Sequence, residues 1–328
     1  MQPDRITGLI ATERAKLAER TRASEEMFRR AVRSLSGGVT SSFQRGDPWP
    51  IYLERGEGAR VWDVDGIEYV DFHNGFSAMV QGHAHPAIRT AIERRLALGT
   101  HFGAPTEDAV AVAEQLARRF GLPRWRFTSS GTESTMSAIR IARARTGRDD
   151  VVKIFGAYHG HHDTAMVSVR VKLAPGWDET EWPPSMPWGA GIPRAVVDQV
   201  HTVHWGDAEA MERRIAELTA SGRAPACVIL EPVMTRGRVE LPPPGYLEAV
   251  REVTRRDGAL LIFDEVKTGL TIAAGGATER FGVEPDIVAL AKALGGGLPS
   301  GAIGMSADVA ELVETGRVHQ VAPSAATR

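Results

Sequence analysis

A lysine at the end of an apolar run, followed by three glycines, most constrains how this chain can fold. The segment reads Asp286-Ile-Val-Ala-Leu-Ala-Lys-Ala-Leu-Gly-Gly-Gly-Leu-Pro-Ser-Gly301. Its apolar part, 287–290, is typical of a strand buried on both faces of a parallel sheet. Lys292 follows the carboxyl end of that strand, where open α/β sheets bind ligands, and the glycines let backbone approach a ligand closely. Alone, Lys292 is either a solvated side chain at a strand exit or a reactive amine.

The 328 residues combine two kinds of pattern. Helical spacing over 8–35 and apolar–polar alternation over 51–71, with the turn signal Asp65-Gly66, predict an N-terminal helical and antiparallel segment. From about residue 86 onward, helical and short apolar segments alternate, which predicts a mostly parallel, doubly wound α/β sheet. The Trp- and Pro-rich stretch 172–192 predicts a long surface loop. We expect helices near 86–98, 107–120, 133–146, 207–220, 245–256 and 306–316, and strands near 124–128, 151–155, 198–203, 226–231, 259–264 and 286–290.

Charge and cysteine content exclude several classes of protein. Thirty-nine Lys and Arg against 41 Asp and Glu give a net charge of −2, so we expect neither nucleic acid nor a membrane as a partner. No apolar run reaches bilayer length, and the N-terminus lacks the apolar core of a signal peptide. The single cysteine, Cys227, cannot form an intrachain disulfide and is expected to be buried and inert, which fits a cytoplasmic protein.

The segment Thr128-Ser-Ser-Gly-Thr-Glu133 stands between a predicted strand and a predicted helix. Hydroxyl groups and free backbone N–H groups at a helix start make a cradle for phosphate. The same pattern of Ser or Thr with a later Glu is also an ordinary helix N-cap. Both interpretations stay open on this segment alone.

Two further segments place polar groups at strand ends. Phe155-Gly-Ala-Tyr-His-Gly-His-His-Asp163 offers either a metal site or an aromatic ring that stacks on a flat ligand. The histidines are crowded within four positions and no second ligand cluster matches them, so we predict stacking by Tyr158 or His159 and no metal. Asp264 ends the buried run 259–264, and a carboxylate there needs a partner. That partner is a ligand atom, a metal or a helix N-terminus.

Together these signals describe one ligand, pyridoxal 5'-phosphate, with its phosphate on residues 130–132 and its aldehyde on Lys292. Asp264 would keep the ring nitrogen protonated so that the ring accepts electrons. Val266 faces the same way as Asp264 and is expected on the opposite face of the ring. Lys292 has to be a neutral amine, which burial beside a cation favours by lowering its pKa, and then moves the substrate proton as a base. The contacts predicted in this way are Ser130, Gly131, Thr132, Tyr158, His159, Asp264, Val266 and Lys292.

With these residues in place, the sequence resembles the class III aminotransferases, which are fold-type I pyridoxal phosphate enzymes. Within the family it looks most similar to glutamate-1-semialdehyde 2,1-aminomutases and their aminotransferase relatives. The resemblance runs from about Phe28 to Val321. It implies that Lys292 forms the Schiff base, that Asp264 pairs with the pyridinium and that Glu231 lies near the cofactor ring. It also implies a homodimer that acts on a small amino donor and a carbonyl acceptor. The matching segments include 56–66, 82–86, 102–107, 130–133, 158–161, 231–232, 263–266 and Lys292 with its glycines.

Departures from the family pattern concern the substrate pocket. Aminomutases carry a carboxylate-binding arginine in the slot that Gln44 fills here, with Arg45 next to it. The run that contains Phe76 also differs from theirs, and Lys267 stands where aminomutases tend to have Met and many transaminases Gln. The resemblance therefore implies an aminotransferase that moves an amino group between an amino acid or amine and a keto or aldehyde acceptor. The alternatives are a glutamate-1-semialdehyde aminomutase and an inactive remnant that binds the cofactor.

We expect three parts along the chain: an N-terminal helix and β-hairpin segment (1–75), a pyridoxal-phosphate-binding large domain (76–317) and an aberrant tail (318–328). Family members continue into a C-terminal small domain, which we expect to be missing here. Removing one base from codons for Val-Gly-Thr-Phe-Ser-Gly-Asn-Pro gives Val-Ala-Pro-Ser-Ala-Ala-Thr-Arg, the last eight residues of the chain. Residues 322–328 are therefore interpreted as the product of a frameshift.

Overall fold

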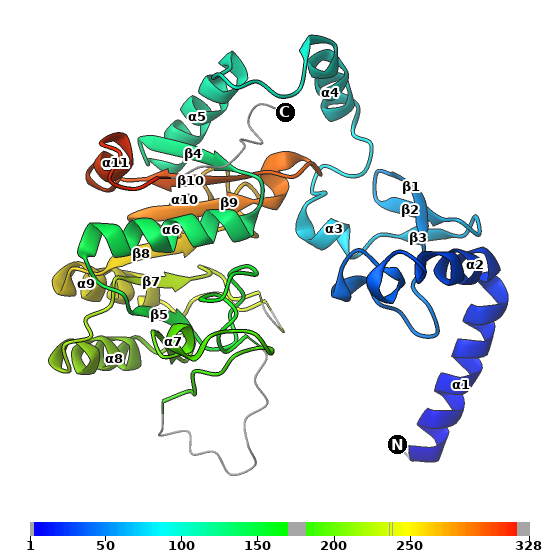
Figure 1. The fold of residues 1–328 in the computed structure, drawn as a ribbon, viewed down its shortest axis with the longest axis horizontal. Helices are drawn as coiled ribbons and strands as arrows, with labels where there is room; N and C mark the ends of the chain where they lie inside the picture. The colour runs from blue at the N-terminus through cyan, green and yellow to red at the C-terminus, as the bar shows by residue number, and fades with distance from the viewer. Residues whose placement is uncertain (1–2, 170–181, 236, 238, 320–328) are drawn as a thin grey trace. The chain divides into compact units, whose positions relative to one another are not determined.

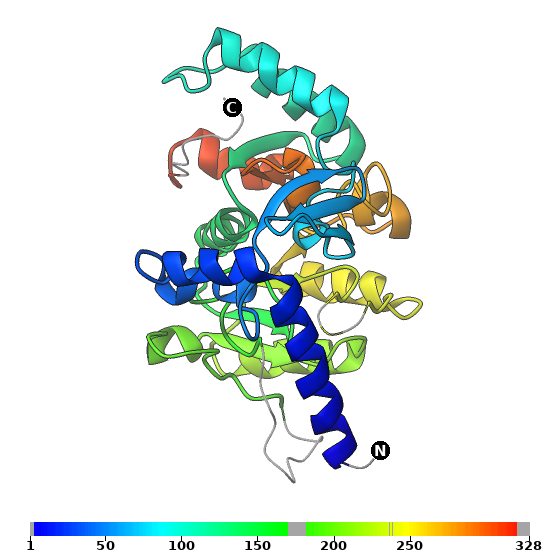
Figure 2. The ribbon, with the colours of Figure 1, turned by 90° about the vertical axis from the view of Figure 1, so that its right-hand side faces the viewer.

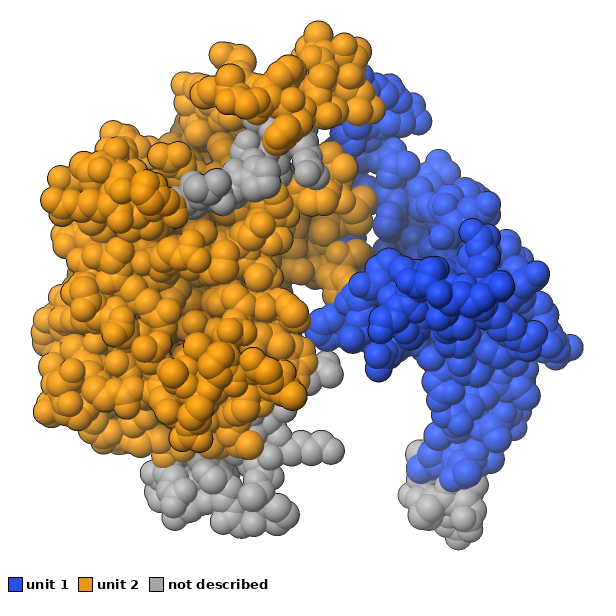
Figure 3. All heavy atoms as spheres, viewed as in Figure 1, with its two compact units in different colours: residues 1–74, 81–93 blue, residues 75–80, 94–328 orange. Residues whose placement is uncertain are grey.

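The computed structural model describes residues 3–169, 182–235, 237 and 239–319. The chain divides into two compact units: the N-terminal unit, 1–74 with 81–93, and the sheet unit, 75–80 with 94–328 (Figure 3). Residues 81–93, which we expected with the large domain, fall in the N-terminal unit, where Gly58 and His83 form an antiparallel bridge. The division at 75 and 317 stays a prediction, and so does the frameshifted tail, because 320–328 lie outside the described residues.

The N-terminal unit begins with two helices and continues into a small antiparallel sheet. The hairpin turn forms at Asp65-Gly66, where Gly66 adopts a φ of 79°. The Asp65 carboxylate accepts hydrogen bonds from the backbone N–H groups of Ala23 (2.6 Å) and Ser24 (2.9 Å), so the turn caps the second helix. The elements are α1 (Pro3–Arg20), α2 (Arg22–Ala31), β1 (Leu53–Glu57), β2 (Arg60–Asp63) and β3 (Glu68–Val70), with the strands in the order β1-β2-β3.

The sheet unit contains a seven-stranded sheet in the order β4-β10-β9-β8-β7-β5-β6 (Figure 1). The pairs that join β6, β5, β7, β8 and β9 are parallel, whereas β10 is antiparallel to both β9 and β4. The mostly parallel sheet is therefore confirmed. Its strands are β4 (Arg124–Thr128), β5 (Val151–Ile154), β6 (Val200–Val203), β7 (Cys227–Leu230), β8 (Leu260–Asp264), β9 (Ile287–Ala291) and β10 (Gly301–Met305).

Strand β10 was missed by sequence analysis because two of its five residues are glycines, which normally weaken a strand. The structure explains why both positions have no side chain. A Cβ atom at Gly304 would lie 2.6 Å from the Trp125 ring, and one at Gly301 would lie 2.3 Å from the Thr128 hydroxyl oxygen. These glycines let β10, which lies between β4 and β9, pack closely against its neighbours.

Helices cover both faces of the sheet because side chains alternate along the strands. In β8, Leu261 and Phe263 pack with α5, α8 and α9, whereas Ile262 packs with α6 and α11. Figure 2 shows α6 and α9 on opposite sides of the sheet. No helix in the described part of the chain combines the length and apolar character needed to cross a membrane. The helices are α3 (Asn74–Ser77), α4 (Pro86–Leu98), α5 (Glu107–Phe120), α6 (Gly131–Thr146), α7 (Arg194–Val197), α8 (Ala208–Ala220), α9 (Tyr246–Asp257), α10 (Gly276–Phe281) and α11 (Ala307–Glu314).

Short elements and chain ends account for the other differences from the sequence-based expectations. Helices α7 and α10 were not expected, and each has only one or two turns. Val318, which we had assigned to the tail, is buried in the core beside α11. The predicted surface loop 172–192 lies partly outside the described residues, which resume at Trp182.

A buried ion pair fastens α9 to the sheet and gives a stability prediction. Arg251 makes two hydrogen bonds to the carboxylate of Asp286, which also accepts one from Leu261 N (2.7 Å). The two side chains are only 12% and 17% exposed. Arg251→Met is expected to lower the free energy of unfolding by about 3 kcal/mol, because Asp286 stays buried without its cation. Urea denaturation followed by circular dichroism measures the loss.

The matched control is Arg256→Met on the same helix, whose pair with Glu212 has both side chains 52% exposed. Water screens this pair, so its loss should matter much less. Equal losses for the two variants would contradict the structural role of the Arg251–Asp286 pair.

Candidate active site

Eight of the nine predicted cofactor contacts line a single cavity of about 260 Å³ in the sheet unit. The cavity lies where β4, β8 and β9 end and where the loop after β5 begins. The eight residues are Ser130, Gly131, Thr132, Tyr158, His159, Asp264, Val266 and Lys292. The ninth, Glu231, is buried and bonded to a residue of the cavity wall.

Lys292 follows β9 directly and has an unusual backbone conformation. Its φ is 51°, in the left-handed region that non-glycine residues rarely occupy, and such strain collects at functional sites. Burial lowers the pKa of its amine, and so does the positive charge of Lys267, whereas the carboxylates of Asp264 and Glu231 act in the opposite direction. The result favours the neutral amine, as expected from the sequence.

Asp264, the last residue of β8, is held by two hydrogen bonds. One carboxylate oxygen lies 2.7 Å from His159 Nδ1, and the other accepts from Val266 N (3.0 Å). Asp264 and His159 are both buried, and His159 Nε2 has no partner among the described residues. We had expected Tyr158 or His159 to stack on a ring, and the structure shows His159 bonded to Asp264. Sequence analysis missed this pair because residues 105 positions apart carry no spacing signal.

The segment 128–133, which we predicted to bind phosphate, leads into α6 and provides its N-cap, Ser130. Ser130 Oγ accepts from Glu133 N (3.2 Å), and the Glu133 side chain accepts from Ser129 N (2.6 Å). The Ser130 bond is the first half of a capping box, whereas Glu133 binds the N–H group one residue before the N-cap instead of that of Ser130 itself. The first turn of any helix leaves N–H groups without partners in the helix, so capping and anion binding are compatible here.

A second lysine, Lys267, lines the same cavity as Lys292. Its Nζ donates to the Glu231 carboxylate (2.7 Å) and to Thr235 Oγ1 (2.5 Å). Glu231 also accepts from Tyr158 N (3.3 Å) and from the Thr235 hydroxyl. Sequence analysis marked Lys267 only as a departure from the family pattern. Its position three residues after Asp264 was the available signal for a place in the site.

A buried lysine, Lys153, holds the loop that carries Tyr158 and His159. Lys153 Nζ donates to the carbonyl groups of Ala157 (2.9 Å) and Val167 (2.7 Å) at the two ends of the loop. The Tyr158 ring packs edge-on against Trp188, with 6.2 Å between ring centroids. A lysine inside an apolar strand gave no recognisable signal for this role.

The three predicted substrate residues are placed differently. Phe76 belongs to the sheet unit, is about half exposed and is not among the residues that line the cavity. Gln44 and Arg45 belong to the N-terminal unit. There the Gln44 amide oxygen accepts from Ser41 N (3.1 Å) and from Thr40 Oγ1 (2.5 Å), so that oxygen serves the local turn. Their role in substrate binding stays a prediction.

Comparison with known proteins decides the family. The family model "Aminotransferase class-III" matches residues 42–325. A glutamate-1-semialdehyde 2,1-aminomutase of Methanothermobacter thermautotrophicus is 42% identical over 300 residues, covering 90% of this chain and 68% of that protein. The chain belongs to the class III aminotransferases.

Solved structures agree with this assignment. The structure of an omega-transaminase from Sphaerobacter thermophilus matches with a TM-score of 0.87 and 39% identity, over 93% of this chain and 70% of that one. A transaminase with bound pyridoxal phosphate matches with a TM-score of 0.83 and 32% identity, over 94% of this chain and 71% of that one. The cofactor of this family is pyridoxal 5'-phosphate, as the sequence predicted.

The cavity of this class III aminotransferase suits that cofactor. It presents an amine with a lowered pKa, a buried carboxylate and the N–H groups of a helix start. Two buried polar atoms on its wall, His159 Nε2 and Ser300 Oγ, lack a partner among the described residues. Buried polar atoms nearly always have partners in a working protein, so these atoms indicate a polar ligand.

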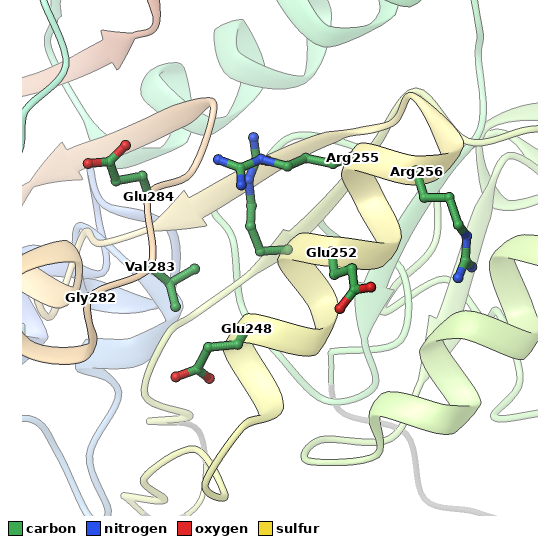
Figure 4. A pocket seen from close by; sticks show the side chains of 8 residues that line it. Glu248, Glu252, Arg255, Arg256, Gly282, Val283 and Glu284 are labelled. Atoms are coloured by element: carbon green, nitrogen blue, oxygen red, sulfur yellow. The ribbon is translucent and has the colours of Figure 1, made fainter.

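Three other candidates, a larger hollow, a metal site and the cysteine, offer no alternative cofactor site among the described residues. A larger hollow of about 620 Å³ lies between α9 and residues 282–284 and is lined mainly by charged side chains (Figure 4). None of the predicted cofactor contacts, all of which are described, lines it. No group of three or more His, Cys, Asp or Glu in the described part of the chain is arranged to hold a metal. Burial raises the pKa of the Cys227 thiol to about 12.

His162 follows His159 in the loop after β5, and its pKa leads to a prediction of how stability depends on pH. Burial, followed by the charges of His159, Arg143 and Lys153, lowers its pKa to about 4 from an ordinary value of 6.5. The folded state therefore keeps His162 neutral while the unfolded state takes up a proton. Its contribution to stability is complete above pH 6.5 and is lost as the pH falls towards 4.

We therefore expect the wild-type protein to lose about 3 kcal/mol more unfolding free energy between pH 7 and pH 4 than His162→Gln does. Urea denaturation at several pH values measures this difference. His161→Gln, which removes the exposed neighbouring histidine, is the control and should keep the wild-type dependence. Parallel pH curves for His162→Gln and wild type would refute the prediction.

Proposed function

We propose that this class III aminotransferase transfers an amino group between an amino acid or amine and a keto or aldehyde acceptor, with Lys292 and Asp264 as its catalytic residues. The observation that carries the proposal is the meeting of a buried carboxylate and a largely buried amine in one cavity. Asp264 ends β8, Lys292 follows β9, and the two strands are parallel neighbours with Asp264 beside Ala289. Parallel strands bring their carboxyl ends, and the groups they carry, to one edge of the sheet.

Pyridoxal 5'-phosphate, when bound, supplies an aldehyde that condenses with amines and a ring that accepts electrons. Asp264, oriented by His159, would hold a proton on the ring nitrogen. Ser130, Gly131 and Thr132 would hold the phosphate, and Tyr158 and Val266 would hold the ring. Glu231 fixes the Tyr158 backbone through its hydrogen bond to Tyr158 N.

Lys292 has two tasks in this proposal. As a neutral amine it binds the cofactor aldehyde, because a protonated amine has no lone pair to offer. When its amine is free, Lys292 would act as the base that takes up and gives back the substrate proton. Its lowered pKa suits both tasks, since it leaves more of the amine unprotonated at neutral pH.

Trapping of the cofactor tests the proposal directly. Pyridoxal 5'-phosphate added to the purified protein should give a visible absorption band that borohydride abolishes irreversibly, with the cofactor attached at Lys292 by peptide mass spectrometry. Lys292→Ala should prevent attachment completely, and Lys16→Ala, which removes an exposed lysine, should not affect it. Attachment at another lysine would contradict the assignment of Lys292 as the cofactor-binding lysine. Attachment without amine-dependent bleaching would instead favour a cofactor-binding remnant.

A glutamate-1-semialdehyde aminomutase is the second candidate, favoured by the 42% identical relative of that name. An aminomutase isomerises its substrate without an external acceptor, whereas an aminotransferase needs one. We expect turnover of amino donors only when a keto acid or aldehyde is added, because Gln44 replaces the arginine of the aminomutase pattern. Assays with and without acceptor measure this, and isomerisation of glutamate-1-semialdehyde alone would reverse the assignment.

We further propose that the protein is a cytoplasmic homodimer. Class III aminotransferases act on small molecules and are commonly dimeric. Large apolar side chains around α4 and α5 are exposed and support a second copy as their cover. Sedimentation equilibrium measures the assembly, and a monomer would contradict it. The exposed side chains are Leu96, Leu98, Phe102, Val110 and Val112.

A further inference from the structure

Two lysines line the cavity, and their surroundings differ sharply. Lys267 Nζ donates to Glu231 (2.7 Å) and to Thr235 Oγ1 (2.5 Å), so its positive charge has a carboxylate partner. Glu231 is only 3% exposed at its side chain. Lys292, in contrast, forms no ion pair with any residue that the structure describes. One lysine is therefore anchored as a cation, and the other is not.

The charged groups that act on Lys292 come from several elements. Asp264 stands at the end of β8, Lys267 in the turn that follows and Glu231 just after β7. Each carboxylate already has its own donors: Asp264 has His159 and Val266 N, and Glu231 has Lys267 and Thr235. The two carboxylates that act on Lys292 are thus both bound to other donors, and Lys267 lines the same cavity as Lys292.

We propose that Lys267 is a positioning residue whose ammonium group, anchored by Glu231 and Thr235, favours the uncharged amine form of Lys292. The inference rests on the proposed role of Lys292 and adds a group that sets the charge of that residue. It concerns a position at which this chain departs from the family pattern.

Elementary electrostatics decides which of the two amines loses its proton. Two ammonium groups in one partly desolvated cavity repel each other, so the amine with fewer stabilising partners becomes neutral first. Lys267 has a buried carboxylate and a hydroxyl to stabilise its charge. Burial and the Lys267 charge both lower the pKa of Lys292, in that order of size. Removing the Lys267 charge should therefore return protons to Lys292.

The experiment measures the protonation of Lys292 in the cofactor-free protein. Acetic anhydride acylates only unprotonated amines, and the sequence has just five lysines, at positions 16, 153, 172, 267 and 292. Peptide mass spectrometry after brief labelling between pH 6 and 10 follows Lys292, with exposed Lys16 as the internal reference. In Lys267→Gln, labelling of Lys292 should move to higher pH. If the pKa of Lys292 rises by about one, its labelling rate falls about tenfold at pH values below the wild-type pKa.

Two matched variants separate charge from structure. Lys267→Arg keeps the positive charge and should leave the labelling curve of Lys292 unchanged. The double variant Lys267→Gln with Glu231→Gln removes both charges of the pair. Because Lys267 acts on Lys292 more strongly than Glu231 does, the double variant should still move the curve to higher pH, but less than Lys267→Gln alone.

The outcomes decide the proposal without reference to turnover. An unchanged curve in Lys267→Gln overturns it. A wild-type curve in the double variant also overturns it, because the single variant would then act only through the freed Glu231 charge. A merely structural role for Lys267 would move the curve in Lys267→Arg as well. Failure of the proposed function is seen separately, as absence of borohydride trapping at Lys292 in the wild-type protein.

Discussion

The site depends on the parallel pairing of β8 with β9. The register places Asp264 beside Ala289, so that β8 delivers a carboxylate and β9, three residues later, delivers Lys292 to the same edge. Neither group would reach a shared cavity if one strand slipped, because a shift by one residue turns every side chain to the other face. The buried alternation of β8, with Leu261 and Phe263 on one face and Ile262 on the other, holds this register.

Buried charges around the cavity are stabilised by dedicated partners. Asp264 is bonded to His159, Glu231 to Lys267, and outside the site Asp286 to Arg251. Each pair joins segments far apart in the chain, and an unpaired buried charge would be strongly destabilising. The same pairing leaves Lys292 without a carboxylate partner of its own among the described residues. The partners that stabilise the buried charges are therefore compatible with the lowered pKa of Lys292.

Local patterns predicted the framework of the fold, and eight of the nine residues proposed as cofactor contacts line one cavity. Short apolar segments located six of the seven strands in the sheet. Five of them, β5 to β9, are buried along almost their whole length and are therefore largely apolar, whereas β4 alternates exposed and more buried side chains. Strand β10 was not predicted because its two glycines weaken the apolar pattern. Both glycines are needed for close packing against Trp125 and Thr128. Lys292, Asp264 and Ser130 were proposed because they lie at or just after the carboxyl ends of strands. The His159–Asp264 and Lys267–Glu231 contacts were not found, because each joins loops whose meeting is set by the tertiary fold.

Gly131 shows how tightly the parts of the cavity are connected. A Cβ atom at this position would lie 2.9 Å from Val266 and 3.3 Å from Ala291, the residue before Lys292. Gly131 begins α6, Val266 follows Asp264, and Ala291 ends β9. The start of α6 therefore rests directly on the exits of both β8 and β9. Any side chain at 131 would push the start of α6 away from Val266 and from the residue that precedes Lys292. The spacing between the three groups is thus set by one residue without a side chain, which explains why a glycine stands inside an otherwise good helix start.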